Sequence, residues 1–306
     1  DSSPSRGLGD VYKRQPPIKG LSYLLISLFI CSCSPTLYVL DKNPQLAGRI
    51  YKTISLAKVD KRLKNNPNDL EALILNVESL TTYAFGFLIE ESDRMMLENY
   101  SKANNLESQA HNYFIEAVQY GDSALSYIDY NFYKWFISND DSEIVDILEI
   151  RRKEEYFRLY YWTAAAYGGA ISSSGGDPKW IVRLPRVGKL LNSIVSIDSS
   201  WNNGAALTAL ISYTMNNPLL SPNEADSISK NLFQKAIQAS GGKDMGPYLS
   251  YAESVSKTRQ NKDEFISLLN QALKIDIKSS KEFQLTNTIS KNRAEWLLDN
   301  IDEFFY

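Results

Sequence analysis

The sequence predicts an all-α fold of stacked helix pairs in a single compact domain, and three observations support this expectation. Beyond Pro35, apolar residues recur at spacings of three and four, which is the period of an amphipathic helix. No segment alternates apolar and polar residues for long enough to predict a sheet. Prolines, glycines and capping Asn or Asp residues divide the chain into segments of helical length.

Long helices are expected in the first part of the chain, at about residues 44–65, 68–96 and 101–127. Asn43 precedes Pro44, an order typical of a helix start, because Asn caps free N–H groups and proline fits the first turn. Pro67 ends this helix, and Asn68 is placed to cap the next one.

The middle of the chain is expected to hold two short helices and two longer ones. They fall near residues 132–137, 142–148 and 151–173 and in a segment that ends at Ile197. Gly175 and Gly176 end the first of the longer helices, because glycine readily adopts the left-handed conformation that follows a helix. Asp177 and Pro178 then supply a new cap and first turn.

The C-terminal half repeats one type of helix ending. The copies are LLNSIVSID at 190–198, FQKAIQAS at 233–240 and LLNQALKID at 268–276. This spacing of about 39 residues resembles tetratricopeptide repeats (TPR) with slightly longer loops. Because each helix pair must stack on its neighbours to bury its apolar face, the pattern predicts a TPR-like α-solenoid with a concave binding surface. The last helix, at residues 292–305, is expected to cap its end, with an oligomer contact on its exposed side as the alternative.

The first 33 residues carry features that do not belong to the fold. Residues 1–15 include DVYKRQ, which resembles the translation of a sequencing adapter, so an artefact is expected there, with a genuine tail as the alternative. Residues 16–32 contain an apolar run that is too short to span a bilayer and is typical of a signal peptide. Cys33 follows in a sequence like a bacterial lipobox. We therefore expect a lipid anchor at Cys33 and one domain over residues 33–306, with a plain secretory signal or a buried N-terminal helix as alternatives.

Composition excludes several classes of function. A formal net charge of −3 leaves no basic excess for phosphate contacts, so no nucleic-acid partner is expected. Cys31 and Cys33 are the only cysteines and His111 is the only histidine, which excludes the common zinc sites and cysteine- or serine-based catalytic sets. Glu90 and Glu91 are adjacent on a predicted helix and point about 100° apart, so they do not form a catalytic pair. We expect no enzyme activity, no catalytic residues, no metal and no cofactor.

Six stretches together resemble the T-component family of the tripartite ATP-independent periplasmic (TRAP) transporters. They are TTYAFGFLIEESD from Thr81, YYWTAAAYGGAIS from Tyr160, DPKWIVRLPRVGKLL from Asp177, DSSWNNGAALTALISYTMNNP from Asp198, GPYLSYAESVSKTRQNKDEF from Gly246 and NRAEWLLDNIDEFF from Asn292. They occur in order and cover essentially the whole mature chain, which is more specific than any one motif.

The resemblance implies a lipoprotein of the bacterial periplasm, lipid-anchored to a membrane, all-helical and TPR-like. It also implies a homotrimer around a pore, which docks the solute-binding P-component of a TRAP transporter and passes a small or hydrophobic ligand. The alternative is a generic TPR envelope lipoprotein that acts as a scaffold for protein partners and binds no small molecule.

Aromatic side chains are the candidate ligand contacts, because their rings supply apolar area and their polar atoms fix orientation. Tyr161, Trp162 and Tyr167 are expected to wall a cleft, next to a run of Ala and Gly residues on the same helix. Core packing is the alternative.

A second wall is expected from Tyr83 and Phe87, which lie one helical turn apart. Tyr213 and Tyr251 are on helices expected to face the concave surface, where they would contact the ligand or pack in the core.

Overall fold

The computed structural model describes residues 39–40, 42–67, 69–138 and 153–305. The predicted adapter, the signal peptide, Cys33 and the helix expected at 142–148 lie outside these residues. In the described part of the chain every regular element is a helix, and no strand is present there. The all-α prediction is confirmed.

The three long N-terminal helices lie within two residues of the predicted bounds, apart from internal π turns, and Asn68, the predicted cap of the second helix, lies outside the described residues. The first consists of α3 (Pro44–Ile50), the π turn η1 (Tyr51–Leu56) and α4 (Ala57–Asn65). The second consists of α5 (Leu70–Tyr83), the π turn η2 (Ala84–Ile89) and α6 (Glu90–Met96), and the third is α7 (Tyr100–Ile128). The Asn43 side chain caps the first helix by accepting from the N–H of Leu46, and Asp69 caps the second by accepting from that of Ala72.

The middle elements are α8 (Tyr130–Ile137), α9 (Lys153–Ser172), α10 (Pro178–Ile181) and α11 (Leu184–Asp198). The predicted Asp177 cap is present, because its carboxylate accepts from the N–H of Lys179. Gly175 and Gly176 both have positive φ angles, which is the conformation expected of residues that end a helix.

The C-terminal elements are η4 (Trp201–Gly204), α12 (Ala205–Met215), α13 (Pro222–Ala239), α14 (Gly246–Tyr251), η5 (Ala252–Ser256), α15 (Lys262–Leu273), η6 (Ile277–Ser279), α16 (Gln284–Asp299) and η7 (Ile301–Glu303). The three similar sequence endings lie at the ends of α11, α13 and α15. Each of these helices contacts the helix that follows it, and α12 also packs on α13 and α14 on α15. Consecutive helices therefore pack on one another through this half, while the TPR solenoid itself stays a prediction.

Two apolar clusters form the core of the described chain. The larger one is built mainly from α5, α7, α8, α9 and α11, and the smaller one from α14, α15 and α16 with Ile211 of α12. The helix over Leu70–Met96 is long and apolar enough to cross a membrane, but 61% of its most apolar window is buried inside the protein. Burial in the core accounts for that apolar character.

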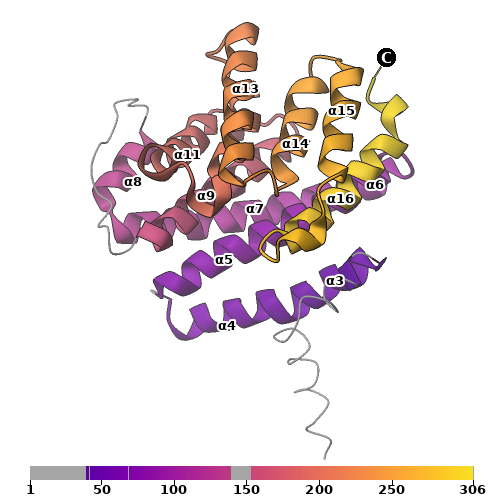
Figure 1. The fold of residues 1–306 in the computed structure, drawn as a ribbon. Coiled ribbons are helices and arrows are strands. Elements are labelled where there is room, and N and C mark those ends of the chain that lie inside the picture. The colour runs from indigo at the N-terminus through magenta and orange to yellow at the C-terminus, as the bar shows by residue number, and fades with distance from the viewer. Residues whose placement is uncertain (1–38, 41, 68, 139–152, 306) are drawn as a thin grey trace, which may run out of the picture.

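Small residues let α7 and α9 approach closely, as the Ala and Gly run of α9 suggested. A Cβ atom on Gly169 of α9 would overlap the ring of Phe114 on α7. On the other side of the contact, a Cβ atom on Gly121 of α7 would overlap the side chain of Thr163. In Figure 1 the helix from α3 to α4 forms one edge of the molecule and α13 rises from the opposite edge, while α16 lies beside α6.

Candidate functional site

A cavity of about 380 Å³ lies between the N-terminal helices and the C-terminal helix. Its walls come from α3, from the helix that contains η2 and α6, from α7 and from α16. The lining residues are Leu40, Pro44, Gln45, Gly48, Arg49, Tyr83, Gly86, Phe87, Leu88, Glu90, Glu91, Arg94, Met95, Leu106, Gln109, Ile289 and Asn292. Most of the cavity surface is apolar, and charged side chains of Arg49, Glu90, Glu91 and Arg94 line part of it.

Aromatic rings form one wall of this cavity. The ring centroids of Tyr83 and Phe87 are 5.8 Å apart, and Tyr51 of η1 lies 6.4 Å from Tyr83 and 5.7 Å from Phe87. The Lys52 ammonium lies 5.9 Å from the Tyr83 centroid and 5.8 Å from that of Tyr113, within the range of a cation–π contact. The predicted pair Tyr83 and Phe87 therefore lines this cavity, and their role in ligand binding stays a prediction.

Two glycines shape the same wall. A Cβ atom on Gly48 would lie 2.9 Å from the Phe87 ring, so only glycine lets α3 pack this close. Gly86, by contrast, has nothing within 4 Å of the position where its Cβ atom would stand. Because Gly86 lines the cavity, a side chain placed there would fill it.

Glu90 and Glu91 are adjacent on α6 and contact different partners, because neighbouring helix residues point about 100° apart. Glu91 accepts from the Gln45 amide at 3.2 Å and lies 3.0 Å from the Lys102 ammonium. Glu90 instead pairs with Arg94, one turn further along, at 2.7 Å. Both carboxylates are thus compensated by hydrogen bonds or cations, and they form a polar rim.

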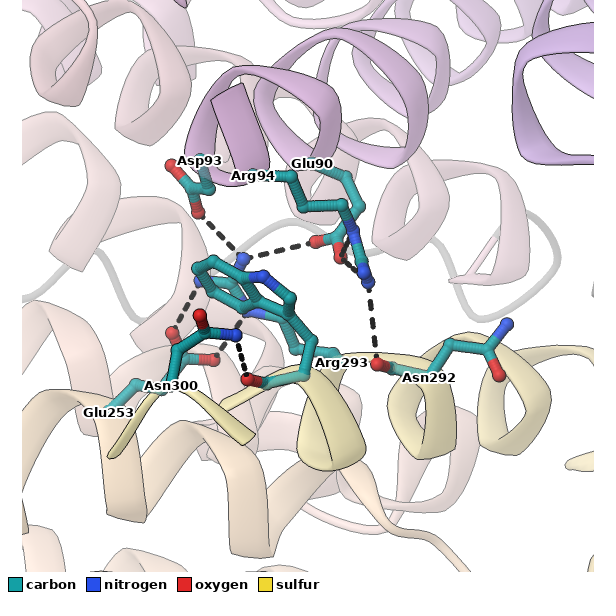
Figure 2. A network of polar contacts seen from close by, with 8 residues as sticks. Glu90, Asp93, Arg94, Glu253, Asn292, Arg293 and Asn300 are labelled. Atoms are coloured by element: carbon teal, nitrogen blue, oxygen red, sulfur yellow. Dashed lines mark hydrogen bonds and ion pairs between the residues drawn. The ribbon is translucent and has the colours of Figure 1, made fainter. Parts of the chain in front are cut away.

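A network of charges joins α6 to α16 next to the cavity (Figure 2). The Arg293 guanidinium lies 2.7 Å from Asp93, 3.2 Å from Glu90 and 2.7 Å from Glu253 of η5. Only 15% of the Arg293 side chain is exposed. Burial raises the pKa of Asp93 above its ordinary value, and the neighbouring Arg293 opposes that rise.

Trp296 of α16 also takes part in the contact between α6 and α16. Its ring lies 5.0 Å from the Arg293 guanidinium carbon and 5.5 Å from that of Arg94. Arg94 also donates to the backbone carbonyl of Asn292 at 3.3 Å, and Asn292 lines the cavity. The C-terminal helix therefore packs on its own neighbours and is also attached to α6, beyond the end-capping role expected for it.

The other predicted ligand residues lie elsewhere. Tyr161 and Trp162 form an aromatic cluster with Trp201 of η4, with centroids 5.4 Å and 5.7 Å from that of Tyr161. Burial raises the pKa of Tyr161 to about 12, and the charge of Asp244 adds to the rise. The Asp244 carboxylate accepts from the N–H of Gly246 at 2.9 Å, and burial raises its own pKa.

Tyr167 is fully buried and belongs to a polar group inside the core. Its hydroxyl lies 2.9 Å from the Asp122 carboxylate, to which it donates, and accepts from Arg186 at 2.9 Å. Tyr251 is 7% exposed and packs on Phe233 with centroids 4.9 Å apart. Both side chains are buried among other residues, and their predicted role as ligand contacts stays a prediction.

Tyr213 of α12 packs against Gly188 of α11, where a Cβ atom would overlap its hydroxyl and ring. The seven predicted residues therefore lie in separate places, and only Tyr83 and Phe87 line the cavity described above.

His111 is half-buried, and its side chain has a hydrogen-bond partner. Its Nδ1 lies 3.1 Å from the Ser173 hydroxyl, and its ring packs edge-on against Trp180 at 5.7 Å. Within the described residues no group of three or more His, Cys, Asp or Glu side chains is arranged to hold a metal.

The network of Arg293 with three carboxylates was not predicted from the sequence. The spacing of Glu90 and Arg94 is the only local signal of this network, because their separation of four residues predicts an ion pair on one helix face. The contact between Arg293 and Glu90 joins residues 203 positions apart, and no local pattern encodes such a pairing.

Fold and site together define an all-helical protein with an apolar cavity between its first and last described helices. The chain matches the family of the TRAP transporter T-component over residues 41–305, nearly its whole length. It belongs to that family, as the sequence resemblance indicated, and its role is therefore that of a transporter component. It is also similar to an uncharacterized protein of Treponema pallidum (strain Nichols), with 20% identity over 223 residues, which cover 73% of this chain and 68% of that protein.

Proposed function

We propose that this chain is a periplasm-facing lipoprotein subunit of a TRAP-type solute transport system. In this role it docks the solute-binding P-component and holds a small ligand with an apolar body in the cavity lined by Tyr83 and Phe87. Family membership supports the transporter role. The lipobox at Cys33 supports a lipid anchor on the periplasmic side of a membrane.

The cavity is the observation that carries the ligand proposal. Its volume of about 380 Å³ is within the usual range for sites that enclose small organic molecules. Tyr83 and Phe87 supply flat apolar surface, while Gln109 and Asn292 add groups that donate and accept hydrogen bonds. A ligand with an apolar body and one polar end fits this lining.

Gly86 offers the sharpest test of the cavity. Gly86→Leu places a side chain in open space inside it, so this variant should fold and lose binding of an apolar probe such as anilinonaphthalene sulfonate. Gly168→Leu on α9 is the matched control, because its Cβ position is also open and Gly168 does not line the cavity. If both variants and the original chain give the same probe fluorescence, the probe does not bind in this cavity and the ligand proposal is wrong.

The partner proposal requires a separate measurement. Light scattering coupled to size exclusion, on residues 34–306 alone and with the solute-binding protein encoded nearest to it, should give a trimer that shifts to a larger complex. A monomer unaffected by that protein would favour the generic TPR scaffold instead. Cavity binding and partner binding are thus tested independently.

A further inference from the structure

The first helix carries a charge opposite to that of the rest of the chain. Residues 44–65 contain the basic residues Arg49, Lys52, Lys58, Lys61, Arg62 and Lys64 and a single acid, Asp60. Everything after residue 65 has an excess of acidic over basic residues. A basic helix on an acidic body indicates that one face of the molecule meets an anionic partner.

Some basic residues of this helix form ion pairs within the protein, and others are exposed and do not. Arg62 pairs with Asp69 at 2.7 Å and Lys64 with Asp60 at 2.7 Å. Lys58 and Lys61 are exposed, and neither forms an ion pair with another described residue. Their charge is therefore directed to the solvent and not used to stabilise the fold.

Apolar side chains accompany these lysines on the same exposed side. Ile54 is 52% exposed and Leu46 is 41% exposed, although Gly48 and Leu63 on the same helix are buried against the protein. A face that presents unpaired lysines can meet the headgroups of anionic lipids, and the isolated apolar side chains beside these lysines can enter the interface.

The position of the helix favours a membrane over a soluble anion. Cys33, the predicted lipid anchor, precedes Lys42 by nine residues, and nine extended residues span at most about 30 Å. The helix also forms an edge of the molecule, on the opposite side from α13 (Figure 1). The beginning of this helix is thus the part of the described fold that the anchor holds nearest to the lipid, and Lys58 and Lys61 lie about four to five turns further along the same helix.

We propose that the exposed side of residues 44–65 lies on the surface of an anionic phospholipid membrane, with Lys58 and Lys61 at the headgroups and Ile54 among the upper acyl segments. This contact adds a second attachment to that of a single lipid anchor and orients the protein. The acidic remainder of the chain is repelled by the same surface, so the cavity and α13 are directed away from or alongside the membrane.

Vesicle sedimentation tests this proposal without the anchor. The protein used is residues 34–306, which retains every contact described above. It should sediment with vesicles of phosphatidylglycerol and phosphatidylcholine, should fail to do so with phosphatidylcholine alone, and should be released by salt. Lys58→Glu combined with Lys61→Glu should weaken binding to the anionic vesicles by at least about tenfold.

The matched control is Lys230→Glu combined with Lys235→Glu, which reverses two exposed charges on α13 and changes the net charge by the same amount. This control should bind like the original chain. Equal loss in both double variants, or no preference for anionic vesicles, would overturn the proposal.

Circular dichroism checks the fold, and Lys58→Gln with Lys61→Gln gives a milder change if the reversal disturbs it. If the Lys58 and Lys61 variants instead dissociate an oligomer and leave vesicle binding unchanged, the face contacts a second copy and the proposal is wrong.

Discussion

The Arg293 guanidinium on α16 lies 3.2 Å from the Glu90 carboxylate on α6, although the two residues are 203 positions apart in the chain. This contact, with those to Asp93 and Glu253, attaches the last long helix to the second one. Since Ile289 and Asn292 of α16 also line the cavity, the network fixes one of the cavity walls.

Arg293→Met should destabilise the protein by about 3 kcal/mol, because it leaves Asp93 and Glu253 without their cation and Glu90 with Arg94 alone. The free energy of unfolding in urea measures this effect. Lys262→Met is the control: its partner Asp302 is 88% exposed, so its loss should cost less than about 1 kcal/mol. Similar unfolding midpoints for the two variants would mean that the network contributes no more than a surface ion pair.

Asp244→Asn should change the pH dependence of stability. Burial raises the pKa of Asp244 above its ordinary 3.8, so the folded state retains a proton that the unfolded state has already lost. Stability from this group therefore falls as pH rises through that window. The Asn variant has no charge to bury and still accepts from the N–H of Gly246.

The stability gained by Asp244→Asn should accordingly grow from about pH 4 upwards and then level off. Urea midpoints at several pH values give this difference directly. Asp244→Ala also loses the acceptor for Gly246, so it should be less stable than the Asn variant throughout. A difference that is constant with pH would show that Asp244 does not titrate as proposed.

Adjacent glycines on α9 should respond in opposite ways. Gly169→Ala forces a methyl group into the Phe114 ring and should cost about 1–3 kcal/mol. Gly168→Ala meets no atom within 4 Å and should stabilise the helix by about 0.5–1 kcal/mol. Thermal unfolding of the two variants distinguishes them, and equal shifts in Tm would contradict the close contact of α7 and α9.

Tyr167→Phe should destabilise the core by about 1–3 kcal/mol, because Asp122 and Arg186 both lose the hydroxyl that joins them. Tyr251→Phe is the matched change, since its hydroxyl makes no hydrogen bond to other described residues, and it should cost little. Should Tyr167→Phe instead reduce binding of the apolar probe with stability unchanged, Tyr167 would be a ligand contact after all.

Helix positions were predictable because their signals are local. Asn43 and Asp177 cap the helices that they were expected to start, and prolines and glycines stand where the described helices begin and end. The π turn η2 was not anticipated, although it contains Phe87 and Gly86, because an extra residue in one turn depends on what the helix packs against.

The candidate site was only partly predictable for a related reason. Tyr83 and Phe87 share a helix face by their spacing, so their proximity follows from sequence alone. Ile289 and Asn292 line the same cavity from α16. Their position depends on how distant helices pack, so it could not be predicted from local sequence. Tyr161, Trp162 and Tyr167 have the composition of a binding wall, but their neighbours Trp201 and Asp122 are supplied by other parts of the chain.

The attachment of α16 to α6 also limits how this architecture can vary. In an open array each repeat contacts only its neighbours, so units can be gained or lost and unfolding can stop part-way. Here a further helix pair inserted between α12 and α15 would carry Arg293 away from Glu90 and open the cavity. The number of helices between α6 and α16 is therefore constrained by these long-range contacts, and the protein should melt as a single cooperative unit.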